Sequence, residues 1–236
     1  MSGHSKWANI KNKKGKTDAL RGKITTKISR EITIAVRMGG PEVTGNMKLK
    51  LALAKAKANN VPKDNIQRAI QKGAGAQDGS NFEEITYEGY GPGGIGLIIE
   101  TATDNRNRTF PEVRTALIKN GGRIADAGSV MFQFTRKGVI VVNTTGEDAL
   151  LEILDAGAED AIEEDGMITV YTDQKDLMKV RASLLEAGLK IEEAELQYVP
   201  NTEIEIVDEE ISAKIEKVMD ALDDLDDVVN VHTNAK

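Results

Sequence analysis

Apolar residues recur at helical spacing through the first third of the chain. The pattern predicts helices over about 18–38, 46–59 and 63–73, with Thr17 or Asp18 as the first cap and Pro62 before the third helix. In the first helix, Leu20, Ile28 and Ala35 fall on one stripe. Phe and Tyr do not occur before Phe82, so these three helices are expected to form a small bundle with an aliphatic core.

A glycine-rich linker at 73–80 precedes a region in which strands and helices are mixed. Strands are predicted at 84–90, 95–102, 129–135, 139–143, 159–163, 167–172, 191–199 and 228–232, and helices at 110–120, 147–156, 174–186 and 208–222. A turn is expected at 136–138. From residue 139 to 199 the order is β-α-β-β-α-β, which is a complete ferredoxin-like unit.

The predicted fold class is α+β, with an N-terminal three-helix basic module followed by two α/β domains. The last helix and strand are too few to form a domain, whereas the segment before residue 136 lacks a helix and a strand. We therefore expect a discontinuous middle domain with the ferredoxin-like unit inserted into it. The expected domains are a basic arm and helical domain at 1–80, a middle domain at 81–136 with 201–236, and an inserted domain at 137–200.

Charge is distributed very unevenly between the two parts of the chain. The net charge of −7 argues against a nucleic-acid partner, but residues 1–78 carry 17 basic and five acidic residues, a net charge of +12, and the remainder has 14 basic and 33 acidic residues, a net charge of −19. This asymmetry is typical of a polyanion-binding module joined to acidic domains, which have basic protein surfaces as possible partners.

The absence of Cys excludes disulfides and thiol catalysis and suits a reducing compartment. The amino terminus lacks the apolar core of a secretory signal, and no apolar run approaches the ~20 residues of a membrane span. We therefore expect a cytoplasmic protein without a membrane partner.

The first 17 residues combine five lysines with the only Trp of the chain. Such a segment buries too little apolar surface to order itself, and when extended it reaches about 55–60 Å. An indole among ammonium groups can stack on an unpaired base while the lysines contact phosphates, although a solvated tail is the alternative. The residues predicted to bind nucleic acid, in this arm and beyond it, are Lys6, Trp7, Lys11, Lys13, Lys14, Lys16, Arg21, Lys23, Lys27, Arg30, Lys48, Lys55, Lys63, Arg68, Arg106 and Arg108.

No catalytic, cofactor or metal site is predicted. The segment Gly89–Gly96 contains G-x-G-x-x-G twice, but a strand rather than a helix follows it, so we interpret it as a glycine-rich hairpin. Arg106 and Arg108 are expected in a loop, where phosphate binding and a structural role are equally supported. Asp104 or Asn105 is expected either to form an Asx turn or to cap the next helix. The acidic run at 223–227 is expected to be solvated, and His232 is expected to have no chemical role.

Four motifs in order resemble the YebC/PmpR family over nearly the whole chain. They are GHSKWANIK from Gly3, NNVPKDNIQRAI from Asn59, YEGYGPGG from Tyr87 and TDNRNRT from Thr103. Small departures, at Ile24-Thr25 and Phe110-Pro111, affect only local packing. The resemblance implies a three-domain cytoplasmic protein without known catalytic residues.

The resemblance leaves two nucleic-acid targets open. Bacterial members are described as probable DNA-binding transcriptional regulators, whereas relatives that include a mitochondrial translational activator are linked to the ribosome. The cations here are mostly lysines, which contact phosphate without reading sequence, and the arm resembles extensions that enter folded RNA, so the residues themselves favour RNA. A nucleotide hydrolase that uses the glycine-rich loop is a distant third hypothesis.

Overall fold

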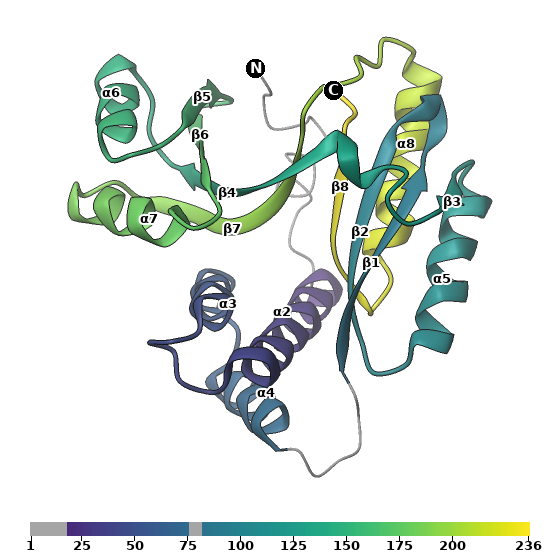
Figure 1. Ribbon diagram of the computed structural model, residues 1–236, viewed down its shortest axis with the longest axis horizontal. Helices are drawn as coiled ribbons and strands as arrows, with labels where there is room; N and C mark the ends of the chain where they lie inside the picture. The colour runs from purple at the N-terminus through teal and green to yellow at the C-terminus, as the bar shows by residue number, and fades with distance from the viewer. Residues whose placement is uncertain (1–17, 76–81) are drawn as a thin grey trace. The chain divides into compact units, whose positions relative to one another are not determined.

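A computed structural model describes residues 18–75 and 82–236, and the side chains from residue 22 onward (Figure 1). The helices are α2 (Asp18–Gly39), α3 (Met47–Ala58), α4 (Lys63–Ala74), α5 (Arg106–Lys119), α6 (Glu147–Asp155), α7 (Leu177–Glu186) and α8 (Glu209–Asp223). The strands are β1 (Glu83–Tyr90), β2 (Gly96–Thr103), β3 (Arg123–Ala125), β4 (Phe134–Val142), β5 (Asp160–Glu164), β6 (Met167–Asp173), β7 (Ile191–Pro200) and β8 (Val228–Thr233). None of the helices in these ranges combines the length and the apolar character that crossing a membrane requires.

Helices α2, α3 and α4 pack around an aliphatic core. Ile28 and Ile32 of α2 meet Leu49 and Ala56 of α3, and Ala69 of α4 closes the cluster. Asn46 caps α3, because its side chain accepts a hydrogen bond from the Leu49 N–H. The predicted stop at Gly73 lies inside α4, where a Cβ would come within 2.5 Å of the Thr33 carbonyl, so this glycine permits a close approach of two helices.

The first sheet has the strand order β3-β1-β2-β8 and is antiparallel throughout. Its apolar face packs against α5 and α8, with Leu97 and Ile99 of β2 contacting Val113, Leu117 and residues of α8. The strand β8 pairs with β2 although about half the chain separates them. The glycine-rich segment joins β1 to β2 through a short 3₁₀ turn (Pro92–Gly94), which confirms the prediction of a hairpin.

The second sheet has the strand order β5-β6-β4-β7, also antiparallel. With α6 after β4 and α7 after β6, this is the ferredoxin-like arrangement that the sequence predicted. Buried residues of β4, β6 and α7, among them Ile140, Ile168 and Leu177, form its core. The α+β fold class is confirmed.

The described chain divides into two compact units. One contains residues 134–201, and the other contains 18–75 and 82–133 together with 202–236. The second unit is thus built from segments on both sides of the first along the chain. The boundaries of the three domains predicted from the sequence remain a prediction.

Sequence-based predictions were wrong in two regions of the chain. The strand predicted at 129–135 and the turn at 136–138 are replaced by a 3₁₀ turn (Met131–Gln133) and by the continuous strand β4. Gly138 pairs on both sides of that strand, and a Cβ there would lie 2.3 Å from the Thr172 hydroxyl and 2.7 Å from the Leu177 Cβ. The glycine therefore allows a helix to pack closely and does not mark a turn.

The second error concerns the start of α5. The helix begins at Arg106 rather than at residue 110, because the Asn105 side chain accepts the Arg108 N–H at 3.1 Å and caps it. Arg106 and Arg108 consequently lie in the first helical turn and not in a loop. The capping residue, Asn105, is one of the two candidates, Asp104 and Asn105, that the sequence indicated.

A fragment spanning residues 134–201 is expected to fold alone, because its sheet and both covering helices lie within it. A cooperative thermal transition by circular dichroism would be the observation in its favour. Gly138→Val in the same fragment should abolish that transition, since the new side chain collides with Thr172 and Leu177. An unfolded wild-type fragment would contradict the predicted domain division.

Candidate nucleic-acid interface

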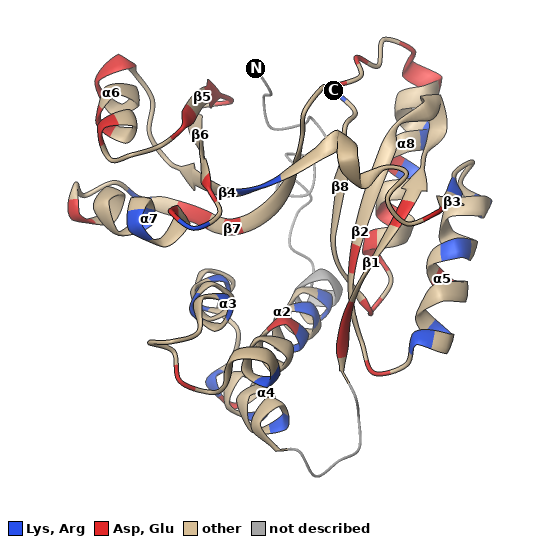
Figure 2. Ribbon diagram, in the orientation of Figure 1, with Lys and Arg blue, Asp and Glu red and all other residues tan. Residues whose placement is uncertain are grey.

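Several residues predicted to bind nucleic acid lie outside the described part of the chain. They are Lys6, Trp7, Lys11, Lys13, Lys14 and Lys16, together with the side chain of Arg21. The remaining predicted residues fall on α2, α3, α4 and α5, where basic side chains are frequent (Figure 2).

The basic face of α2 pairs with the acidic run that ends α8 and leads into β8. The Lys23 ammonium lies 2.7 Å from an Asp224 oxygen, and the Lys27 ammonium lies 2.8 Å from an Asp223 oxygen. Arg30 completes the row by binding Asp227. Because the three cations are spaced four and three residues apart on one helical stripe, they meet the acidic run together.

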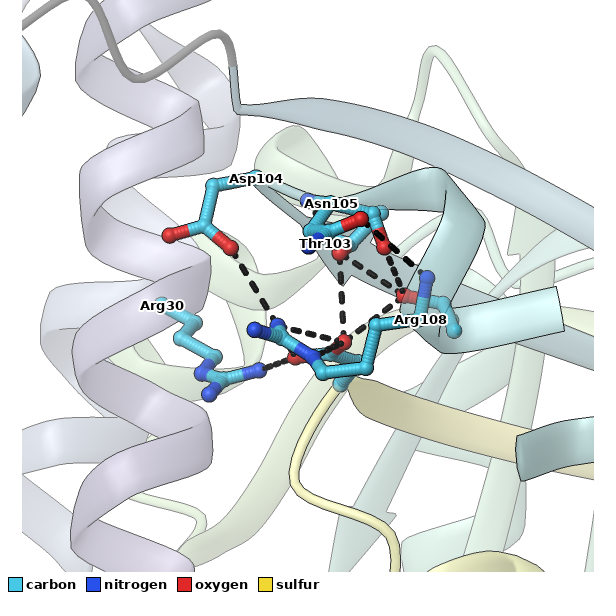
Figure 3. A network of polar contacts seen from close by, with 7 residues as sticks. Arg30, Thr103, Asp104, Asn105 and Arg108 are labelled. Atoms are coloured by element: carbon cyan, nitrogen blue, oxygen red, sulfur yellow. Dashed lines mark hydrogen bonds and ion pairs between the residues drawn. The ribbon is translucent and has the colours of Figure 1, made fainter. Parts of the chain in front are cut away.

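Asp227 is the centre of a buried polar network (Figure 3). Only 1% of Asp227 is exposed, although the sequence predicted a solvated acidic run, so that prediction is wrong for this residue. The Arg108 guanidinium donates from Nη2 to both carboxylate oxygens, at 2.9 and 2.8 Å. The Thr109 and Thr103 hydroxyls donate to Oδ2 at 2.7 and 3.1 Å, and Arg30 binds Oδ1.

These contacts determine the protonation of Asp227. Burial by itself raises the pKa of the carboxyl group, but the hydrogen bonds from Thr109, Arg108 and Arg30 outweigh it, and the pKa falls below its ordinary value. Asp227 is therefore ionised at neutral pH and holds α2, α5 and the start of β8 together.

A second buried carboxylate, Glu88 on β1, holds the loop before β4. Its oxygens accept the backbone N–H groups of Gly128, Val130 and Met131 at 2.5, 2.6 and 2.8 Å. Burial raises the pKa of Glu88, but these hydrogen bonds lower it below its ordinary value. Glu88 was not predicted from the sequence, because its partners are backbone groups 40 or more residues away.

The lysines of α3 separate into two rows. Lys48 and Lys55, which the sequence analysis selected, are half-buried and form ion pairs with Glu84 at 2.5 Å and Glu31 at 3.0 Å. Lys50 and Lys57 form the exposed row, and neither has an ion-pair partner among the described residues. The sequence shows that the two lysines of each row are seven residues apart. It does not show which row is exposed, because that depends on where Glu84 and Glu31 lie in the fold.

The predicted residues on α4 and α5 lie at the surface. Lys63 is exposed, and Arg68 binds the Asn65 side chain at 2.8 Å. On α5, Arg106 is exposed, whereas Arg108 is held by Asp227. Three basic residues that were not predicted from the sequence are also exposed, namely Arg114, Lys119 and Arg123.

Two further sequence-based expectations concern chemistry. His232 is buried in β8, and its Nε2 lies 2.9 Å from a Glu100 oxygen on the paired strand, so it has a structural contact. Within residues 18–75 and 82–236, no three or more His, Asp or Glu side chains are grouped so that they could hold a metal ion.

Comparison with known proteins gives a consistent family assignment. Residues 5–76 match the family model described as the TACO1/YebC protein N-terminal domain, and residues 82–235 match the TACO1/YebC second and third domain. A relative from Desulforamulus reducens, named "Probable transcriptional regulatory protein", is 49% identical over 99% of this chain and 98% of its own length. A relative of the same name from Francisella tularensis subsp. novicida is 51% identical over 100% of this chain and 96% of its own.

A solved structure supports the fold as well. The crystal structure of a conserved hypothetical protein, Aq1575 from Aquifex aeolicus, superposes with a TM-score of 0.91 at 43% identity, and covers 98% of this chain and 97% of its own.

Asp227→Asn is expected to lower the free energy of unfolding by about 2–4 kcal/mol at pH 7, because it leaves Arg30 and Arg108 without their carboxylate. The folded-state pKa of Asp227 is depressed, so its contribution is complete above the unfolded pKa of about 3.9 and is lost as the pH falls through the folded value. Urea denaturation of both proteins across pH 2–7 measures the difference. Asp226→Asn, in the exposed part of the same run, is the matched control and should change stability by less than about 0.5 kcal/mol. Equal stability of the Asp227 variant and the wild type at pH 7 would contradict the role given to the network.

Proposed function

Because the chain belongs to the TACO1/YebC family, we propose that it regulates gene expression by binding nucleic acid and carries out no catalysis. The observation that carries the proposal is the separation of charge, with +12 in residues 1–78 and −19 in the remainder. A cationic module attracts the phosphate backbone, and acidic domains limit non-specific association. The names of the relatives describe transcriptional regulation and agree with a regulatory role.

The proposed binding mode is contact with phosphates rather than reading of base edges. Arginines are the side chains best suited to bidentate recognition of guanine, but Arg30 and Arg108 are held by Asp227. The exposed cations of the helical segment are dominated by lysines such as Lys50, Lys57 and Lys63. Lysine contributes a point charge, which favours binding without sequence preference.

The second candidate function is that of a ribosome-associated translation factor whose N-terminal arm binds structured RNA. It is favoured by the predominance of lysine among the exposed cations of the helical segment and by the Trp7-containing lysine-rich arm, whose composition suits entry into folded RNA. Duplex DNA at promoters is the target that the relatives' names favour. The two candidate targets differ in the effect expected when the Trp7 side chain is removed, since an indole can stack on the unpaired bases of RNA.

Nucleotide hydrolysis is not part of the proposal. The glycine-rich segment joins two antiparallel strands, β1 and β2, whereas a dinucleotide or phosphate loop leads from a strand into the amino terminus of a helix. This topology is consistent with a protein that acts by binding and not by catalysis.

The two lysine rows of α3 give a charge-matched test of the binding mode. Replacing Lys50 and Lys57 by Gln should reduce the magnitude of the log K against log salt slope by about 1.4–1.8, which is two phosphate contacts. Replacing Lys48 and Lys55 by Gln changes the net charge equally, but should leave the slope nearly unchanged because these lysines neutralise Glu84 and Glu31. Titrations with a labelled duplex and a labelled RNA measure both slopes. A slope for the Lys50 and Lys57 double variant that equals the slope of the wild type would exclude this row as a phosphate contact.

The arm provides the test of the target. Trp7→Ala should cost about 1–3 kcal/mol in affinity for RNA with unpaired bases and almost nothing for duplex DNA, because only unpaired bases stack on an indole. The measurement is a competition at one physiological salt concentration among ribosomes, structured RNA, a promoter-like duplex and a scrambled duplex. A variant with Lys11, Lys13, Lys14 and Lys16 replaced by Gln is the control, since it should weaken binding to every target. The RNA candidate would be excluded if the protein strongly preferred the promoter-like duplex over the scrambled duplex and if Trp7→Ala left that preference unchanged.

A further inference from the structure

We propose that a pocket at the carboxyl end of α5 takes one unpaired nucleobase of the bound strand, stacked on the guanidinium plane of Arg123. The inference rests on the proposed function and adds a subsite to it. The pocket has a volume of about 420 Å³, within the range of small-molecule sites. Its lining is formed by Tyr90, Gly91, Gly94, Gly121, Gly122 and Arg123.

The stacking surface is fixed before any ligand arrives. Arg123 and Tyr90 are opposite each other in the pairing of β3 with β1, and the guanidinium carbon lies 4.5 Å from the centroid of the Tyr90 ring. The Tyr90 hydroxyl donates to the Ser129 carbonyl at 3.1 Å, so the ring is held at its far end. The loop that carries Ser129 is itself held by the three hydrogen bonds to Glu88.

Arg123 is accessible to a ligand. The residue is exposed, and it has no carboxylate partner in the described ranges 18–75 and 82–236. A guanidinium placed over an aromatic ring can also stack on a planar base, as arginines do in RNA recognition. This arrangement gives a layered order of tyrosine, arginine and base.

The pocket is not built for a pyrophosphate, although it is rich in glycine. The N–H groups of its four glycines are already donated to carbonyls, from Gly91 to Ile95, Gly94 to Gly91, Gly121 to Ile118 and Gly122 to Leu117. A phosphate cradle needs such N–H groups free. The pocket also adjoins the carboxyl end of α5, where the helix dipole disfavours an anion. A planar, largely uncharged group is therefore the ligand that fits.

Glycine also leaves room for the base. At Gly94 an added Cβ would meet no atom within 4 Å, so the wall there faces open space. Its φ of +77°, and the φ of +81° at Gly121, are values that other residues adopt only at a cost. Lys119 is exposed in the last turn of α5, which ends beside the pocket, and it supplies a cation for a flanking phosphate.

Arg123→Lys tests the proposal, because it keeps the charge and removes the planar face. The probes are a fluorescein-labelled 15-nucleotide oligouridine and a labelled 15-base-pair DNA duplex at one salt concentration. The variant should bind the oligouridine about 5- to 100-fold more weakly than the wild type, which corresponds to the loss of one base stack, and should bind the duplex equally well. Arg114→Lys, on the exposed surface of α5, is the matched control and should change neither affinity.

A second readout follows the base directly. An oligonucleotide with one 2-aminopurine should lose fluorescence on binding to the wild type, and the quenching should be smaller with Arg123→Lys at saturating protein. Unchanged oligouridine affinity and unchanged quenching in that variant would overturn the subsite while leaving the proposed function intact. An equal loss for oligouridine and duplex would also overturn it, since Arg123 would then contact phosphate. A wild-type protein that binds neither probe would overturn the proposed function together with the subsite.

Discussion

The arrangement of the larger unit depends on one buried carboxylate. Asp227 receives Arg30 from the helical segment and Arg108 from α5, and it stands immediately before the strand that completes the first sheet. An ionised group with 1% exposure is tolerated only when its hydrogen-bonding capacity is used, and here two arginines and two threonines use it. Lys23 and Lys27 extend the same contact at the surface, where each pair adds less. These ion pairs join α2 to the segment that leads into β8.

This constraint divides the cations of the basic segment into two groups. Those facing the acidic run or a neighbouring glutamate hold the protein together, and those facing solvent are available to a polyanion. Lys48 and Lys50 are two residues apart on α3 and belong to different groups, because Lys48 but not Lys50 meets a carboxylate among the described residues. The net charge of a segment therefore overstates the charge that it offers to a partner.

Much of the fold could be read from the sequence, because hydrophobic periodicity is a local property. The β-α-β-β-α-β order and the glycine-rich hairpin both follow from it. What could not be read depended on partners distant in the chain. Gly138 resembles a turn residue until Leu177 is known to lie against it, and Asp227 resembles its solvated neighbours until Arg30 and Arg108 reach it. The candidate site was the part least predictable from the sequence. A row of lysines can be recognised there, but the acidic residues that neutralise one row cannot. Arg123 gave no signal, as its partner Tyr90 is set by strand pairing.

The pairing of Phe134 with Pro200 at one end of the second sheet also bears on the order of folding. Once that sheet has formed, the chain leaves it beside the point at which it entered, and the loop that separates β2 from β8 is effectively shortened to about half. Halving a loop lowers its closure cost by roughly 0.6 kcal/mol, so early folding of residues 134–201 assists the late arrival of β8. The acidic run arrives with β8, 197 residues after Arg30. During synthesis, the basic face of α2 emerges long before its neutralising acids do, and a nascent chain presents to its surroundings a more cationic surface than the finished protein.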